Sequence, residues 1–218
     1  MATILEYLPL LLEGAWITLI VFVLTLVMSL PLGLPIALGE ESKYKVISII
    51  CKAYVFVFRG TPLMLQLFFF YFFFPIAFDI RLEALTAAIL TFTLNYAAYF
   101  AEIYRGGIKS IDKGQYEAAF ALGVSKKQTL FDIILPQTMK AILPPVANET
   151  ITLVKDTALI MAIGCNELMK NTNSIVNRTS DITPFIVAAL IYLAMTFVLT
   201  IISGRLEKYF SRYDHRGE

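Results

Sequence analysis

The sequence has little of what metal and thiol chemistry need. Among 218 residues it contains one histidine, His215 in a charged tail, and two cysteines, Cys51 and Cys165. No Cys, His, Asp or Glu spacing matches a metal-ligand pattern. These absences argue against a metal centre and against catalysis that depends on histidine.

Charged residues are scarce as well. They make up 16% of the chain, which is 58% hydrophobic, whereas about a quarter of the residues in soluble domains are charged. Four runs contain no charged residue: 14–39, 60–78, 84–101 and 182–204. A bilayer span needs roughly 17–25 mostly apolar residues. One such run could be a buried core helix, but four leave too little polar sequence to cover them, so the pattern predicts an integral membrane protein.

A fifth candidate span, residues 141–166, is apolar but contains Glu149, Lys155 and Asp156. The predicted fold class is therefore all-α and integral to the membrane, with five transmembrane helices in a single domain over residues 1–218. The expected spans are about residues 14–39, 55–78, 84–105, 137–166 and 182–208. At the start of the second span, Thr61 is a plausible N-cap and Pro62 fits the first helical position.

Basic residues set the expected orientation. With five spans, fourteen Lys and Arg residues fall on one side of the membrane and three on the other, with Lys155 inside a span. The positive-inside rule then places the N-terminus outside and the C-terminus in the cytoplasm. No Lys or Arg precedes Lys43, so the first run lacks the basic region of a cleaved signal peptide. Cys51 and Cys165 would lie near opposite faces and stay unpaired.

The long loop of about residues 109–130 falls on the cytoplasmic side and is polar. Asp112 followed by Gln115, and Ser125 followed by Gln128, are capping-box patterns. Gly123 fits the left-handed position after a helix. The loop is therefore predicted to be a short helix, a tight turn and a second helix that runs to about Leu135, where Pro136 interrupts it.

Three uses of this loop compete. Its pattern resembles a DNA-binding helix-turn-helix, but that unit needs a third helix to bury its apolar face, and here both ends run into the membrane. An amphipathic loop lying on the bilayer is a second alternative. The third is docking to a soluble partner, favoured by an apolar stripe of Tyr116, Ala119, Phe120 and Gly123 and by the small Ala118 beside it.

Two polar stripes cross the predicted third and fourth spans. Thr91, Asn95, Tyr99 and Glu102 recur at helical spacing on one, and Glu149, Thr152 and Asp156 on the other. Charged groups inside spans are costly and are functional candidates by default. The candidate substrate-pathway residues are Thr91, Asn95, Tyr99, Glu149, Thr152 and Asp156.

In such a pathway Glu149 could accept an ammonium or guanidinium group, and helix ends could bind a carboxylate. The alternative is that these polar groups join helices to one another. Lys155 and Asp156 would then form structural ion pairs with neighbouring residues, and Glu102 would pair with a nearby basic residue.

Several segments together resemble a known family. Glu117-Ala-Ala, Gly123 and the Leu135-Pro136 ending resemble the EAA loop of ABC importer permeases. Arg59-Gly-Thr-Pro-Leu-Met-Leu-Gln-Leu-Phe, Lys155-Asp-Thr-Ala-Leu and Asn95-Tyr-Ala-Ala-Tyr-Phe-Ala-Glu-Ile-Tyr-Arg-Gly-Gly-Ile resemble the polar amino-acid permease subfamily. These matches cover most of residues 55–165 in the right order.

The resemblance implies a permease subunit of a polar amino-acid importer in the plasma membrane of a prokaryote. Its implied partners are a second permease copy or a homologous permease chain, a cytoplasmic ATPase dimer and an extracytoplasmic amino-acid-binding protein, with no nucleic acid. The implied ATPase-coupling residues are Tyr116, Glu117, Ala118, Ala119, Leu122 and Gly123.

The chain contains no Gly-x-x-x-x-Gly-Lys-Ser/Thr phosphate-binding loop. It is therefore expected to be no enzyme and to bind no cofactor itself, with ATP and Mg bound by the partner ATPase. A secondary amino-acid transporter that works without ATP is the alternative function.

Overall fold

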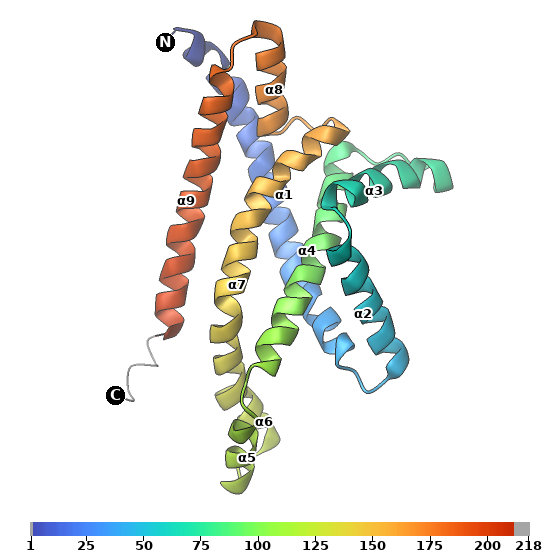
Figure 1. Cartoon of the computed structure of the whole chain (residues 1–218), viewed down its shortest axis with the longest axis vertical. Coiled ribbons are helices and arrows are strands. Elements are labelled where there is room, and N and C mark those ends of the chain that lie inside the picture. Colours follow the sequence, from blue (N-terminus) through green and yellow to red (C-terminus); the bar gives the residue numbers. More distant parts are fainter. Residues whose placement is uncertain (1, 212–218) are drawn as a thin grey trace.

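The computed structural model describes residues 2–211, and in that range the chain is all-helical with no strand (Figure 1). The elements in chain order are α1 (Ala2–Glu40), α2 (Lys45–Gly60), α3 (Leu63–Phe78), α4 (Ala84–Lys109), α5 (Lys113–Ala121), α6 (Lys126–Gln128), the π-helix η1 (Thr129–Ile134), α7 (Leu135–Asp156), the 3-10 helix η2 (Thr157–Ile163), α8 (Leu168–Thr179) and α9 (Thr183–Ser211). The all-α prediction is confirmed. His215, Arg212 and Arg216 lie outside the described residues.

Three described helices are long and apolar enough to cross a bilayer: α1 from Ile4, α4, and α9 as far as Phe210. The bent pair α2 and α3 passes the same test as one span, which makes up to four. Helix α7 is not among them and carries four charged side chains, including Glu149 and Asp156. The count of five spans stays a prediction, with α7 as its fifth member.

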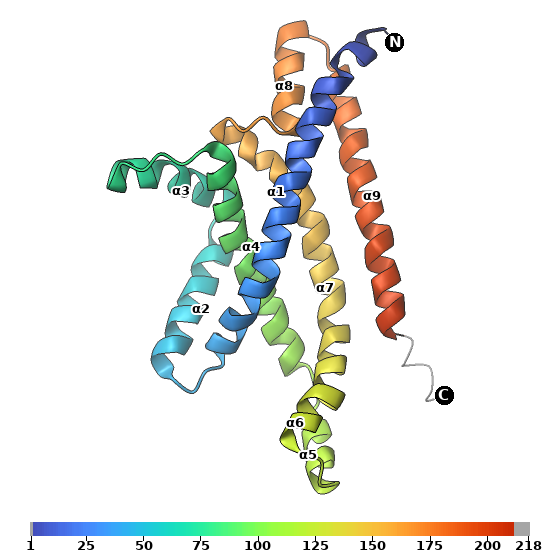
Figure 2. The same cartoon turned by 180° about the vertical axis from the view of Figure 1, so that it is seen from behind.

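Helix α4 is the centre of the bundle. In the 18-residue apolar stretch of α4, 61% of the residues are buried. In the corresponding stretch of α9 only 6% are buried, so most of α9 faces outward. Helix α1 lies along α4 (Figures 1 and 2). A Cβ added at Gly33 of α1 would lie 2.9 Å from Phe100 Cβ and 3.0 Å from Ala101 N of α4. Small residues that let helix backbones approach closely are typical of membrane helix packing.

A second close approach joins α4 to α7. A Cβ added at Gly107 of α4 would overlap the side chain of Ile142, which is itself buried. Ile142 lies between the start of α7 and the charged residues near its end. The two helices therefore contact one another at a fixed point in the lower half of the bundle, close to the loop that joins them (Figure 1).

The predicted second span is two helices. Residues 45–54, expected in a loop, are the first turns of α2, and α3 then turns by 108° away from it. Thr61 is not the N-cap of α3; it ends α2, and its hydroxyl donates to Val57 O (2.8 Å). Pro62, expected inside the helix, caps α3 instead, with extended backbone (ψ 132°).

Buried side-chain amides satisfy the backbone at this break. Gln66 Nε2 donates to Phe58 O (2.9 Å) and Thr61 O (3.1 Å). Asn95 Nδ2 of α4 also donates to Phe58 O (3.0 Å). Irregular backbone inside a membrane is tolerated only where protein or water satisfies its polar groups. Gln66 and Asn95 supply those partners, so side-chain hydrogen bonds stabilise the break between α2 and α3.

The long loop forms α5, a turn at Gly123 (φ +70°) and α6, as predicted. Both bonds of the Ser125–Gln128 capping box are present. At the first cap the side chain of Asp112 accepts from Gly114 N (2.6 Å), and Gln115 does not complete a box.

The predicted interruption at Pro136 is wrong, because α6, η1 and α7 follow one another without a gap. Proline lacks an N–H and would break a ladder of i→i−4 bonds. The bond from Leu135 N to Leu130 O spans five residues instead, and Pro136 falls in the first turn of α7, where proline is tolerated.

Helix α8 stands beside the start of α1 at the opposite end of the molecule (Figure 2). Its N-cap is Glu167, which is fully buried and accepts from Met169 N (2.8 Å) and Lys170 N (2.6 Å). The hydroxyl of Tyr192 on α9 donates to the same carboxylate (3.1 Å). Glu167 thus fixes α8 to α9. No pattern in the sequence indicates this contact.

Candidate functional site

A polar pocket of about 210 Å³ lies between α4 and α7, beside the first residue of α3. Its lining residues are Leu63, Asn95, Tyr96, Tyr99, Glu149, Thr152 and Asp156. Five of the six residues predicted to line a substrate pathway are among them. The fold therefore brings the two polar stripes of the sequence together in one pocket. Their part in transport remains a prediction.

Thr91, the sixth, does not line this pocket. It is fully buried in α4, and its hydroxyl donates to Ala87 O one turn earlier (2.7 Å). Serine and threonine in helices often use their hydroxyls in this way. Regular spacing placed Thr91 on the polar stripe, but the start of α4 packs against the core.

Tyr96 joins the two walls of the pocket. Its hydroxyl, on α4, donates to Asp156 Oδ2 at the end of α7 (2.7 Å). Lys155 and Asp156 were expected to form structural ion pairs with neighbours, but neither makes an ion pair among the described residues, and Lys155 is exposed. The carboxylate of Glu149, also half-buried, faces the same space. The pocket is thus lined by two carboxylates and two tyrosines.

The N-terminus of α3 supplies the opposite polarity. Leu63, its first residue, lines the pocket, and α3 has no side-chain cap. The first N–H groups of a helix lack partners within the helix and carry partial positive charge. Asn95 and Gln66, joined by a hydrogen bond of 2.9 Å, hold this end of α3 against α4. The pocket therefore combines two carboxylates with the uncapped start of a helix.

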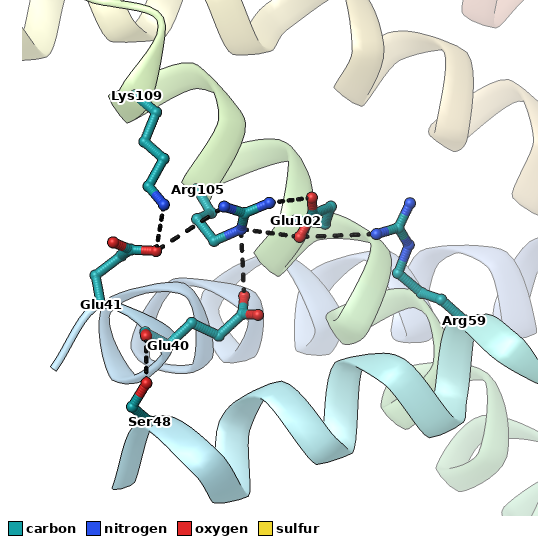
Figure 3. Close-up of polar contacts among 7 residues, drawn as sticks. All are labelled: Glu40, Glu41, Ser48, Arg59, Glu102, Arg105 and Lys109. Atoms are coloured by element: carbon teal, nitrogen blue, oxygen red, sulfur yellow. Dashed lines mark hydrogen bonds and ion pairs between the residues drawn. The ribbon is translucent and has the colours of Figure 1, made fainter. Parts of the chain in front are cut away.

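Below the pocket a cluster of ion pairs follows α4 toward the loop (Figure 3). Arg105 makes a bidentate contact to Glu102 and lies 3.9 Å from carboxylate oxygens of both Glu40 and Glu41. Lys109 pairs with Glu41 at 2.7 Å. The hydrogen bond from Lys109 holds the pKa of the Glu41 carboxyl below its usual value. As expected, Glu102 pairs with basic neighbours rather than with the pocket.

The predicted docking loop is exposed at the end of the molecule (Figure 1). Glu117, Ala118 and Gly123 are exposed, as are the large side chains of Tyr116 (41%) and Leu122 (82%). Ala119 differs: it is 1% exposed and packs inward against the chain. Five of the six predicted coupling residues are therefore exposed, and the sixth, Ala119, is buried. Their contact with a partner stays a prediction.

An apolar hollow of about 330 Å³ opens on this loop, lined by Tyr116, Phe120, Val124, Lys126, Thr129 and Leu130. Phe120 is 84% exposed beside it. Exposed apolar groups gathered around a hollow are typical of an interaction surface.

Sequence reasoning missed several residues that build the site. Gln66 and Tyr96 do so from α3 and α4, and Glu40 and Glu41 anchor the ion pairs from the end of α1. The spacing of Glu102 and Arg105 signals a local pair, but no pattern in the sequence indicates the contact with α1.

Long apolar helices, a polar pocket between two of them and an exposed helical loop at one end define the chain as a permease-type membrane protein. Residues 29–212 match the family of the binding-protein-dependent transport system inner membrane component. The chain belongs to this family.

Related sequences match this chain over nearly its whole length. The arginine transport system permease protein ArtQ of Bacillus subtilis (strain 168) is 40% identical over 201 residues, covering 92% of each chain. The glutamine transport system permease protein GlnP of Escherichia coli (strain K12) is 39% identical over 202 residues, again 92% of each. A crystal structure of an amino acid ABC transporter with histidines superposes with a TM-score of 0.88 at 34% identity, covering 95% of this chain and 97% of the other.

Proposed function

We propose that this chain is the transmembrane permease subunit of an ATP-driven ABC importer for polar amino acids. One structural relationship carries the proposal. Glu149, Thr152 and Asp156 of the polar pocket lie on α7, and α7 continues directly from the exposed loop through α6 and η1. A partner that moves the loop therefore acts on the helix that forms one wall of the pocket.

A polar amino acid suits the chemistry of the pocket. Its volume of about 210 Å³ lies below the roughly 300–1,000 Å³ of sites for drug-sized ligands. Glu149 and Asp156 would attract an ammonium or guanidinium group. The free N–H groups at the start of α3 would receive the α-carboxylate. The named relatives carry arginine and glutamine in their names, and both compounds present these groups.

The exposed loop is the proposed contact with a cytoplasmic ATPase dimer. Tyr116, Glu117 and Leu122 would enter a groove of the ATPase, and Ala118 and Gly123 would permit close approach. ATP and Mg would be bound by that partner, because this chain has no phosphate-binding loop. Closure of the ATPase dimer would then shift the loop and α7 together.

Helix α3 is the proposed contact with a second permease, either a copy of this chain or a homologous chain. Its outer half projects away from the bundle (Figure 1). Along α3, Phe69, Phe72 and Ile76 are 54%, 53% and 83% exposed. The aromatic run of α3 would line the seam between the two permeases, and the polar pockets of both chains would open toward it.

Orientation follows from the basic residues. We place the N-terminus and α8 on the outer face of a prokaryotic plasma membrane, where an amino-acid-binding protein delivers substrate. The loop and the end of α9 lie in the cytoplasm. The fourteen-to-three division of Lys and Arg supports this arrangement.

The test is uptake by proteoliposomes that contain this permease, its ATPase and its binding protein. We expect uptake of L-arginine or L-glutamine that requires ATP and the binding protein. An ATPase variant lacking the phosphate-loop lysine is the control and should abolish uptake. Uptake driven by an ion gradient with the ATPase omitted would overturn the proposal in favour of a secondary transporter.

A further inference from the structure

Tyr99 borders two cavities, the polar pocket and a second cleft of about 440 Å³. The second cleft lies between the end of α1, α2 and α4, and its lining residues are Glu40, Lys52, Val55, Phe56, Arg59, Gly60 and Tyr99. It combines one carboxylate with two cations. Nothing in the proposed function yet uses it.

Arg59 lines the second cleft beside Tyr99, the residue that the two cavities share. Its guanidinium lies 5.4 Å from the centre of the Tyr99 ring, and its Nη1 lies 3.7 Å from Glu102 Oε2 (Figure 3). Within residues 2–211 it donates no hydrogen bond. A guanidinium presents five N–H donors in a planar fork that matches a carboxylate. Arg59 is therefore held in place with its hydrogen-bonding capacity unused.

The other two charged groups of the cleft are also incompletely paired. Lys52 is exposed and makes neither a hydrogen bond nor an ion pair within the part of the chain that the structure describes. Glu40 is only 5% exposed, and its Oε2 accepts no hydrogen bond. The nearest cation to that oxygen is Arg105 Nε at 3.9 Å. Buried carboxylate oxygens are normally hydrogen-bonded, so Glu40 retains capacity for a donor.

The cleft also lies in the direction of release. Along α4, Asn95 and Tyr99 line the polar pocket, whereas Glu102, Arg105 and Lys109 follow toward the end where the docking loop begins. That end is cytoplasmic in the proposed orientation. The second cleft thus falls between the polar pocket and the cytoplasm, with Tyr99 shared by both.

We infer that this cleft is a second station for the transported amino acid, occupied after the polar pocket and before release. Lys52 and Arg59 bind its α-carboxylate, and Glu40 receives its ammonium group. This inference rests on the proposed function, because it takes the direction of import from it. It adds a site that is reached from the polar pocket during import and that internal amino acid can also fill from the cytoplasmic side.

A site of this kind predicts inhibition by internal amino acid. Proteoliposomes of the complete importer are preloaded with millimolar L-arginine or L-glutamine, and the initial ATP-driven uptake of the same labelled amino acid is measured. We expect internal amino acid to slow wild-type uptake. The uptake rate of each variant is normalised to its own rate without internal amino acid. In Lys52→Gln and in Arg59→Gln we expect the half-inhibitory internal concentration to rise about tenfold, equivalent to about 1.4 kcal/mol.

Matched controls isolate the cleft. Lys52→Arg keeps the cation and should retain inhibition, and Lys45→Gln removes an exposed cation of α2 outside the cleft and should behave as wild type. Internal L-argininamide or L-glutaminamide lacks the carboxylate and should inhibit weakly.

Absence of wild-type inhibition, unchanged inhibition in both Gln variants, or equal inhibition by the amides would each overturn the inference. Failure of the proposed function gives a different result, since no ATP-dependent uptake would be seen at all.

Discussion

The hydroxyl of Tyr96 donates to the carboxylate of Asp156 across 2.7 Å and thereby joins α4 to α7 in the wall of the polar pocket. Tyr96 is 2% exposed, so its hydroxyl has no access to bulk water in place of this partner. The bond fixes one of the two pocket carboxylates, whereas the other, Glu149, makes no hydrogen bond or ion pair within residues 2–211.

Tyr96→Phe removes this bond while keeping the ring. We expect the variant to lose about 1–2 kcal/mol of stability and to raise KM for uptake, because Asp156 is left without its donor. Thermal unfolding in detergent and uptake in proteoliposomes measure the two effects. Tyr104→Phe, which removes a longer bond to Leu30 O (3.2 Å) outside the pocket, should change stability but not KM. Equal KM values for both variants would contradict the role of Tyr96.

Glu149→Gln tests the charge preference of the pocket. Loss of this carboxylate should raise KM for L-arginine about tenfold, corresponding to about 1.4 kcal/mol, and should affect L-glutamine less. Glu13→Gln, an exposed acid on α1, serves as the control for an altered charge. If the kinetics for both amino acids stay unchanged, Glu149 has a structural part only.

Glu117→Lys reverses a charge on the exposed docking loop. We expect weaker co-purification of the ATPase, by roughly tenfold or more, with normal membrane insertion, because like charges across a contact cost several kcal/mol. Glu83→Lys at the other end of α4 makes the same change away from the loop. A retained ATPase together with continued transport would show that docking occurs elsewhere.

Glu167→Gln probes the buried cap of α8. Burial raises the pKa of the Glu167 carboxyl to about 7, above its unfolded value. Its contribution to stability is therefore fully present below about pH 4.5 and is lost as pH rises through 7. Between pH 5 and pH 8 the wild-type melting temperature should fall more than that of Glu167→Gln, whose cap does not titrate. Parallel pH profiles would mean that Glu167 does not titrate in this range.

Gly33→Ala places a methyl group against the backbone of α4, 3.0 Å from Ala101 N and 3.1 Å from Ala97 O. Overpacking of this kind costs about 1–3 kcal/mol. Gly106→Ala is the matched change, because a Cβ there meets nothing within 4 Å, and it should stabilise the helix by about 0.5–1 kcal/mol. Thermal unfolding of both variants in detergent measures the two effects. A lower melting temperature for Gly106→Ala than for wild type would contradict the open space found around Gly106.

Much of this arrangement could be predicted from the sequence. Long uncharged runs predict the helices α1, α4 and α9 because length and hydropathy suffice for them. Polar stripes at helical spacing predicted five lining residues of the pocket, since a side chain's face follows from its position in a helix. Capping chemistry is equally local, and the Ser125–Gln128 box formed as expected.

The rest depends on contacts between distant segments. The 108° turn at Thr61 is stabilised by Gln66 and by Asn95, and Asn95 lies more than thirty positions away from Phe58, whose carbonyl it reaches. The helix continues through Pro136 because a π-helical stretch precedes it, and no pattern in the sequence predicts that stretch. Thr91 followed the polar period but was buried by the packing of α4.

The contact between Gly107 and Ile142 gives the column from Lys126 to Asp156 the properties of a lever. At about 1.5 Å per residue this column is roughly 45 Å long, and Ile142 is its fulcrum between the loop and the pocket. A tilt of the column as one body then swings its two ends in opposite directions. A push on the loop toward α4 would draw Asp156 away from Tyr96, so a tilt of this kind would break the hydrogen bond that joins the two walls of the pocket.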